Sequence, residues 1–309
     1  MTPNDPQNPL CQVRKTRDFF IGIDSDGCVF DTMEVKHKEC FIPNIVKTFG
    51  LAAVSRYARE VAEFINLYSH WRGINRFPGL TLTMDLLARR PEVQRRGFDV
   101  PMLPGLRDWI ERESRLGNPA LLAEVERTGD PDLDLTHQWS EAVNRSVGEI
   151  VRGVPPFPLV RESLQGLAGK ADLIVVSATP GEALQREWVE HDLARHVALI
   201  AGQELGNKTE HLALATAGRY AKDQVLMVGD APGDFRAAEA NDALFYPVLP
   251  GLEEESWQRF HDEALPRFFN GTYAGPYMIA LIDRFEALLP TTPPWQSTPT
   301  SGTIKSTLP

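Results

Sequence analysis

Cysteine is scarce in this sequence of 309 residues, and long apolar runs are absent. The three cysteines, Cys11, Cys28 and Cys40, are an odd number and show no CxxC spacing. Neither a disulfide framework nor a zinc site is therefore indicated. The longest apolar stretches, such as Leu173–Val176 and Val225–Val228, are far too short to span a bilayer.

Positive charge is in deficit. The chain has 32 Lys and Arg residues against 42 Asp and Glu residues, which gives a formal net charge of −10 at pH 7. This balance argues against nucleic acid or an anionic membrane as the main partner. It does not exclude a small phosphate ester, because a site can be locally cationic, especially with a bound metal.

A secretory signal is lacking as well. Residues 1–9 are polar and rich in proline, with no cationic start followed by an apolar block, so we expect a cytoplasmic protein. The content of 42% hydrophobic and 24% charged residues is ordinary for a globular protein and excludes a disordered chain. The length suffices for one large domain or two modest ones, each with its own core.

Two patterns of apolar residues divide the chain. A short apolar run at Phe19–Ile23 ends at a polar turn and predicts a buried strand. From Asp31 to Gly153 the apolar residues recur at helical spacing, and no convincing strand is found. From Pro155 onward, strands and helices alternate. Strands are predicted at 172–176, 197–201, 225–228 and 243–248, and helices at 159–167, 182–190, 209–220 and from 234.

This alternation implies an α/β fold in which helices cover both faces of a parallel sheet. The simplest assembly adds the first strand to that sheet and treats the helical stretch as an insertion. A further helical segment at 253–289 either covers the sheet edge, mediates a dimer or packs on the insertion. The expected units are an α/β core of 17–31 and 152–289, an all-α insertion of 32–151, and disordered ends at 1–16 and 290–309.

Polar side chains follow four of the predicted strands or their connections. Open parallel sheets bind ligands at the carboxyl ends of their strands, so these side chains are expected to share one site. They are Asp24 and Asp26 after the first strand, Ser177 after the strand at 172–176, Lys208 before the helix at 209–220, and Asp230 and Asp234 after the strand at 225–228.

Each of these groups supplies something that phosphoryl transfer needs. A carboxylate can attack phosphorus and form an aspartyl phosphate. A second carboxyl must protonate the leaving oxygen and then take a proton from water. Several carboxylates close together require a hard cation with oxygen ligands, and magnesium is the usual choice beside phosphate. A lysine and a hydroxyl can hold the remaining phosphoryl oxygens.

Taken singly, each group also has a purely structural interpretation. Asp24–Gly27 is a good turn by composition, and Asp230 also suits a turn at the end of a strand. Ser177 and Asp234 suit helix caps. A lone lysine such as Lys208 is usually solvated. The joint order of all four clusters along successive strands favours the catalytic interpretation.

The motifs resemble those of a known family. The segment Ile-Gly-Ile-Asp24-Ser-Asp26-Gly-Cys-Val-Phe-Asp-Thr resembles the first signature of the haloacid dehalogenase (HAD) superfamily. Val-Val-Ser177-Ala-Thr-Pro resembles the second signature, Lys208 fits the third, and Gly-Asp-Ala-Pro-Gly-Asp234 fits the fourth. The match covers residues 18–31 and about 155–248.

The resemblance implies a Rossmann-like core with assigned chemical roles. Asp24 would be the nucleophile and Asp26 the general acid and base. Ser177, Ala178 and Lys208 would contact the phosphoryl group. The resemblance also implies that Mg²⁺ is held by Asp24, the Asp26 backbone carbonyl and Asp230. Asp234 would be an outer residue of the metal site.

The helical insertion lies where the family places its C1-type cap, a lid over the active site. Its segment Trp71–Phe77 resembles the Lys/Arg-Gly-x-x-Arg loop of beta-phosphoglucomutase-like caps. That likeness implies substrate contacts from Arg72, Asn75 and Arg76. A basic, glycine-containing loop between two helices is also a common surface connection.

The expected function is a magnesium-dependent phosphatase that hydrolyses a small phosphorylated metabolite. Asp26 favours phosphate monoester chemistry, because dehalogenases and phosphonoacetaldehyde hydrolases of the family lack this second aspartate. One alternative is a phosphomutase, in which the aspartyl phosphate passes its group to another hydroxyl of a bound sugar phosphate. Another is a non-catalytic phosphate-binding protein. Neither nucleic acid nor a membrane is expected as a partner.

Overall fold

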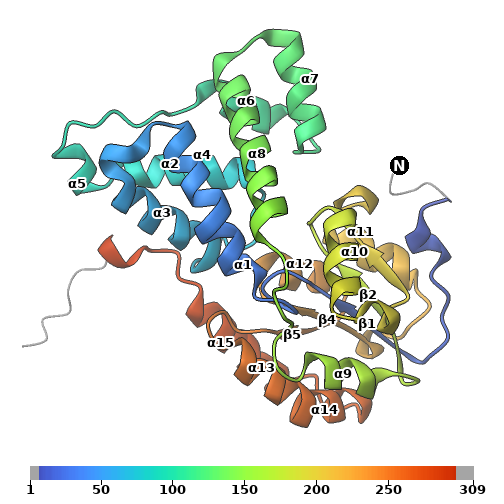
Figure 1. Ribbon diagram of the computed structural model, residues 1–309. Coiled ribbons are helices and arrows are strands. Elements are labelled where there is room, and N and C mark those ends of the chain that lie inside the picture. The colour runs from blue at the N-terminus through green and yellow to red at the C-terminus, as the bar shows by residue number, and fades with distance from the viewer. Residues whose placement is uncertain (1–6, 297–309) are drawn as a thin grey trace, which may run out of the picture.

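The centre of the protein is a parallel five-stranded sheet in the computed structural model, which describes residues 7–296. The strands lie in the order β3-β2-β1-β4-β5, so the first strand of the chain is central (Figure 1). All neighbouring pairs are parallel. The predicted α/β sheet is confirmed. Its strands are β1 (Phe19–Ile23), β2 (Ala171–Val176), β3 (Leu199–Ala201), β4 (Val225–Gly229) and β5 (Leu244–Pro247).

Helices cover both faces of the sheet, which explains why its strands are continuous apolar runs. Along β1, Ile21 and Ile23 pack in one apolar cluster and Phe20 packs in another, because successive side chains point to opposite faces. The first cluster includes side chains of α9, α10, α13, α14 and α15, and the second those of α11, α12 and again α15. These helices are α9 (Val160–Leu167), α10 (Gly181–Glu190), α11 (Lys208–Thr216), α12 (Pro232–Ala240), α13 (Glu253–Arg259), α14 (Leu265–Phe269) and α15 (Pro276–Leu288).

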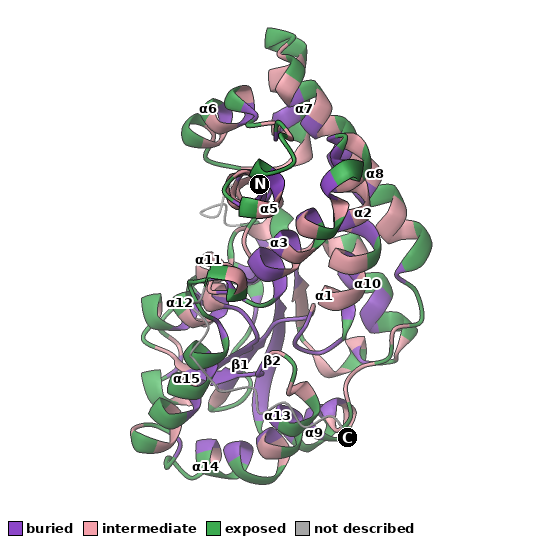
Figure 2. Cartoon of the chain, turned by 90° about the vertical axis from the view of Figure 1, so that its left-hand side faces the viewer, coloured by how far each residue is buried: buried purple, intermediate pink, exposed green. Residues whose placement is uncertain are grey.

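Most of the insertion between β1 and β2, hereafter the cap (residues 32–151), consists of helices joined by loops and contains no strand, as predicted. It has its own apolar core, which includes Ile65, Phe77, Trp109 and Trp139. Figure 2 shows buried positions both in the sheet and among the helices of the cap. The cap comprises α1 (Thr32–Val35), a π-helical turn (Lys36–Phe41), α2 (Ile42–Thr48), α3 (Ser55–Leu67), α4 (Arg76–Ala88), α5 (Pro91–Gln94), α6 (Pro104–Arg112), α7 (Asn118–Thr128) and α8 (Pro131–Ile150).

The N-terminal segment differs from the prediction of disorder. Residues 1–6 lie outside the described residues, but residues 7–16 pack on the core. Leu10 is fully buried in a short 3₁₀ turn. Thr16 donates its backbone N–H, at 2.8 Å, and its hydroxyl, at 2.5 Å, to the carboxylate of Asp172. The prediction was wrong for residues 7–16 because this polar segment carries a buried leucine and satisfies a carboxylate on β2.

The C-terminal helices pack mainly against one face of the sheet. Trp257 is fully buried there and donates its indole N–H to the Cys28 carbonyl at 2.7 Å. Tyr273 donates its hydroxyl to the Phe245 carbonyl at 2.7 Å. Of the three roles expected for residues 253–289, covering the sheet edge agrees with the contact of Tyr273 with the edge strand β5, whereas Trp257 lies on one face of the sheet. Within residues 7–296, no helix combines the length and apolar character that a membrane span requires.

The chain then returns to the cap. The His70 backbone N–H donates to the Pro290 carbonyl at 3.4 Å, and the Trp295 ring packs 5.6 Å from Phe64 and 4.3 Å from the Arg90 guanidinium. The predicted disorder of 290–309 is therefore wrong for residues 290–296, where a tryptophan finds apolar and cationic neighbours. Residues 297–309 lie outside the described residues.

The contact of Trp257 with Cys28 predicts that the C-terminal helices support the loop after Asp24. Trp257→Ala should lower the free energy of unfolding by about 3–5 kcal/mol, because it leaves a large cavity. Trp257→Phe keeps most of the packing and should cost about 1–2 kcal/mol through the unpaired Cys28 carbonyl. Urea unfolding measures both, with Gln258→Ala on the exposed side of α13 as control. Equal midpoints for Trp257→Ala and Gln258→Ala would contradict this role.

Candidate active site

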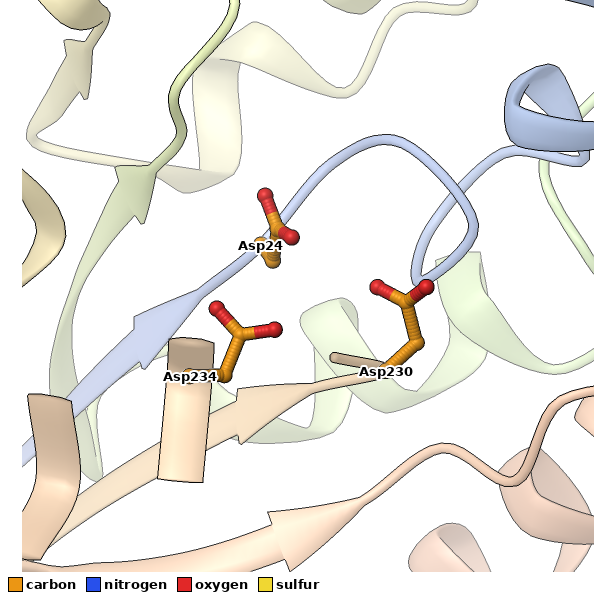
Figure 3. Close-up of side chains that lie close together, drawn as sticks. All are labelled: Asp24, Asp230 and Asp234. Atoms are coloured by element: carbon orange, nitrogen blue, oxygen red, sulfur yellow. The ribbon is translucent and has the colours of Figure 1, made fainter. Parts of the chain in front are cut away.

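Three carboxylates meet at the carboxyl edge of the sheet. Asp24 follows β1, Asp230 follows β4, and Asp234 lies in the first turn of α12. One oxygen from each lies within 4.8 Å of the others, and all three side chains are buried. Figure 3 shows the three carboxylates gathered beside the ends of these strands. The sequence had predicted this meeting from the positions of the residues after their strands.

Two glycines make room for this cluster. A Cβ atom at Gly229 would lie 2.3 Å from the Asp234 carboxyl carbon, so no larger residue fits between β4 and α12. Gly27 has φ +74°, and a Cβ atom there would lie 2.5 Å from Asp230 Oδ2. The glycines of the first and fourth motifs therefore serve close packing around the carboxylates.

Lys208 joins two members of the cluster. Its Nζ lies 2.6 Å from Asp24 Oδ2 and 2.6 Å from Asp234 Oδ1. The helix that carries it starts with a reciprocal cap, since Glu210 N–H donates to the Asn207 side chain and Asn207 N–H donates to the Glu210 carboxylate. This cap fixes the start of α11, so the lysine in its first turn reaches the strand ends.

Burial makes negative charge costly in this cluster. It raises the pKa of Asp24 to about 6 despite the attraction of Lys208, and the charge of Asp234 adds to the rise. Burial also raises the pKa of Asp230 to about 6, against the effect of Arg72. Burial alone would lower the pKa of Lys208, but the two carboxylates raise it above its usual range. The site therefore favours any cation that can bind its oxygens.

The donor set fits a hard divalent cation. It consists of carboxylate oxygens, which Mg²⁺ prefers. Among the described residues, the buried Oδ1 atom of Asp230 has no hydrogen-bond partner. A buried carboxylate oxygen without a partner is costly, and a metal ion would satisfy it.

Arg72 reaches this cluster from the cap. Its Nη2 lies 2.6 Å from Asp230 Oδ2, its Nε lies 3.0 Å from the Asp230 carbonyl, and its side chain is 2% exposed. Another of its nitrogens donates to the Leu67 carbonyl at 2.9 Å. The loop resemblance implies a substrate contact for Arg72, whereas its side chain ends on a predicted metal ligand. A substrate contact by Arg72 stays a prediction.

The other two residues of that loop are held inside the cap. Asn75 caps α4 through Phe77 N–H and donates to the Leu116 carbonyl at 3.0 Å. Arg76 donates to Ser140 Oγ at 2.9 Å and to Asn144 Oδ1 at 2.8 Å. Burial lowers the pKa of Arg76 to about 10, against the attraction of the Glu141 charge. Arg76 is thus a half-buried cation whose hydrogen-bond partners are neutral.

Asp26 lies beside the cluster and is held by donors that sequence reasoning missed. Thr32 donates its hydroxyl to Oδ1, Lys36 Nζ lies 2.5 Å from the same oxygen, and Thr179 Oγ1 lies 2.6 Å from Oδ2. Burial raises the pKa of Asp26, but Lys36 and the two hydroxyls outweigh it and bring the pKa below its usual value. Thr32 and Lys36 are four residues apart, so helical spacing after the first motif is the signal that pairs them.

The second motif lies at the end of β2, next to β1 in the sheet. Ser177 is buried, donates its backbone N–H to the Ala201 carbonyl at 3.0 Å, and accepts a hydrogen bond from Thr179 N–H at 3.3 Å. Ala178 is exposed beside it. The contact of Thr179 with Asp26 brings this loop to the first motif.

Comparisons with known proteins give weak likenesses. No protein-family model matches the chain, and no curated protein sequence matches it. A predicted phosphoglycolate phosphatase of Haemophilus somnus is 14% identical, with 76% of this chain and 86% of that chain covered and a TM-score of 0.44. A HAD-superfamily hydrolase of subfamily IA from Geobacter sulfurreducens is 18% identical, with 75% and 88% covered and a TM-score of 0.39.

A third similar structure is CbbY from Rhodobacter sphaeroides in complex with phosphate, with 12% identity, 74% of this chain and 85% of that chain covered, and a TM-score of 0.40. At these values the likenesses assign no activity to this chain. The case for a function rests on its own fold and on the side chains at the strand ends.

Proposed function

We propose that this protein is a HAD-type phosphatase that hydrolyses a small phosphate monoester through an aspartyl phosphate on Asp24. The observation that carries the proposal is the arrangement around Lys208, whose ammonium lies 2.6 Å from the carboxylates of both Asp24 and Asp234. Residues from three of the four sequence motifs thus meet in direct contact, although Asp24 and Lys208 are 184 residues apart in the chain.

The proposed reaction has two steps. A carboxylate oxygen of Asp24 attacks phosphorus while the bond to the leaving oxygen breaks, and Asp26 gives that oxygen a proton. Water then attacks the aspartyl phosphate, Asp26 takes a proton from it, and inorganic phosphate leaves. Lys208 neutralises charge on the phosphoryl oxygens, and the Ser177 hydroxyl and the Ala178 backbone N–H hold them.

The proposed cofactor is Mg²⁺, bound by Asp24, the Asp26 backbone carbonyl and Asp230, with Asp234 beside it. When bound, it would neutralise charge on the transferring phosphoryl group. Arg72 binds Asp230 and would have to share this carboxylate with the metal or release it.

We further propose that the core (17–31 and 152–289) performs the chemistry and that the cap acts as a lid. The half-buried cation Arg76 supports a role of the cap in selecting an anionic substrate. The described side chains to which its guanidinium donates are neutral, and an anionic ligand would stabilise such a charge.

A screen of phosphate monoesters with Mg²⁺ tests the proposed function. We expect release of inorganic phosphate from at least one small ester by the wild-type protein. An isomerised sugar phosphate without free phosphate would instead indicate a phosphomutase. No turnover and no isomerisation of any ester, with phosphate binding retained, would indicate a non-catalytic phosphate-binding protein.

Arg76→Ala should weaken catalysis on the ester found by the screen by about 10²-fold in kcat/KM, through the loss of one charged contact. Hydrolysis of p-nitrophenyl phosphate should change far less, because that ester needs only the core residues. Initial rates on the two esters measure the difference, with Arg145→Ala elsewhere on the cap as control. Equal losses on both esters would show that Arg76 supports the fold of the cap and selects no substrate.

A further inference from the structure

Lys36 lies in a buried charge cluster at the junction of cap and core. It belongs to the π-helical turn that follows α1, and its side chain is 8% exposed. Its Nζ lies 2.5 Å from Asp26 Oδ1 and 3.5 Å from Glu187 Oε1, which is carried by α10. The lysine therefore links the acid/base predicted by the first motif to a glutamate that belongs to no motif.

Glu187 is an unusual residue for a helix that covers a sheet. Its side chain is 7% exposed, and neither carboxylate oxygen has a hydrogen-bond partner among the described residues. Lys36 is its ion-pair partner. Burying a carboxylate with a single, long ion pair is costly, so stability alone does not account for it.

The helix that carries Glu187 is anchored to the loop after β1. The next residue, Trp188, is fully buried and donates its indole N–H to Ser25 Oγ at 3.0 Å. Glu187 is thereby held at a fixed place relative to Asp26, and Lys36 lies between the two carboxylates.

Both oxygens of Asp26 are engaged by fixed donors. Thr179 of the core binds Oδ2, and Thr32 and Lys36 of the cap bind Oδ1. A general acid must be aimed at the leaving oxygen, within hydrogen-bond reach, for proton transfer to be efficient. The two hydroxyls are neutral, whereas the Lys36 ammonium binds the Asp26 carboxylate through a charge-assisted hydrogen bond and is itself paired with Glu187.

We propose that Lys36, anchored by Glu187, is a positioning residue that aims Asp26 at the leaving oxygen of the substrate. This role rests on the proposed phosphatase function. In the first step the bond between phosphorus and the leaving oxygen breaks, and the protonated form of Asp26, which its low pKa makes a stronger acid, gives its proton to that oxygen. Lys36 holds the carboxyl in line for this transfer and exchanges no proton itself.

The role predicts a dependence on the leaving group. Phenyl phosphate releases a weakly acidic phenol and needs a proton from the general acid, whereas p-nitrophenyl phosphate releases a stable phenolate and needs little help. For Lys36→Met, we expect kcat/KM to fall about 10²-fold on phenyl phosphate and less than about tenfold on p-nitrophenyl phosphate. Glu187→Gln should change the two values in the same direction and by less, and Lys36→Arg should restore part of the loss.

The experiment measures kcat/KM of both aryl esters with Mg²⁺ for the wild type and these variants. Lys38→Met is the matched control, since Lys38 lies two residues away and binds Glu34 and Tyr68. Equal losses on both esters, or no rescue by arginine, would show that Lys36 only ties the cap to the core. If Lys36→Met fails to fold, Glu187→Gln tests the role. The quantity to compare is its loss of kcat/KM on phenyl phosphate relative to its loss on p-nitrophenyl phosphate. A wild type that cleaves neither aryl ester nor any ester of the screen would overturn the proposed function and this role with it.

Discussion

Asp24→Asn is expected to abolish turnover of every phosphate ester while the fold stays intact. The amide keeps the shape of the side chain and loses the nucleophilic oxygen, so the loss should be on the order of 10⁴-fold or more. Stability should not fall, because the buried carboxylate has a raised pKa and is itself costly to ionise. Release of inorganic phosphate and thermal unfolding measure the two effects.

The same substitution on α15 provides the control for Asp24→Asn. Asp283 is exposed there, and Asp283→Asn should leave both activity and stability unchanged. Asp24→Asn with activity within tenfold of the wild type would rule out Asp24 as the attacking group. An unfolded Asp24→Asn protein would mean instead that the charge contact with Lys208 holds the sheet edge together.

The sheet could be predicted because its strands carry strong local signals. β1, β2 and β4 are short apolar runs that end in turns, and the structure starts each of them within one residue of the predicted position. The order of polar residues after those strands then located the carboxylate cluster, since parallel strands end at one edge. The sequence showed the residues that lie on this edge, but not their contacts.

Contacts made across long chain separations were beyond sequence reasoning. Lys36 and Glu187 are separated by 151 positions, as their numbers show, and nothing in the chain pairs them before the sheet forms. Arg72 was identified by a loop motif, yet its direction depends on how the cap packs over β4. The packing of residues 7–16 on the core likewise depends on a tertiary contact, the hydrogen bonds of Thr16 to Asp172.

Removal of divalent metal is the second change expected to have a large effect. EDTA should abolish hydrolysis and Mg²⁺ should restore it, because buried carboxylates alone repel a phosphate ester. Calcium should support the reaction poorly, since it is larger and binds in looser geometry. Full turnover in EDTA would refute the assigned cofactor.

Thermal unfolding tests the same metal site without any substrate. Folding raises the pKa values of Asp24 and Asp230 from 3.8 to about 6. Between these two pH values the folded state therefore binds more protons than the unfolded state. The stability of the metal-free protein should therefore fall as the pH rises from about 4 to about 6. Above that window both carboxylates are charged, and Mg²⁺ should raise Tm more at about pH 7.5 than at about pH 5. Asp230→Asn should remove most of this Tm shift, whereas Asp283→Asn should keep it. An equal shift in all three proteins would place the bound magnesium outside the carboxylate cluster.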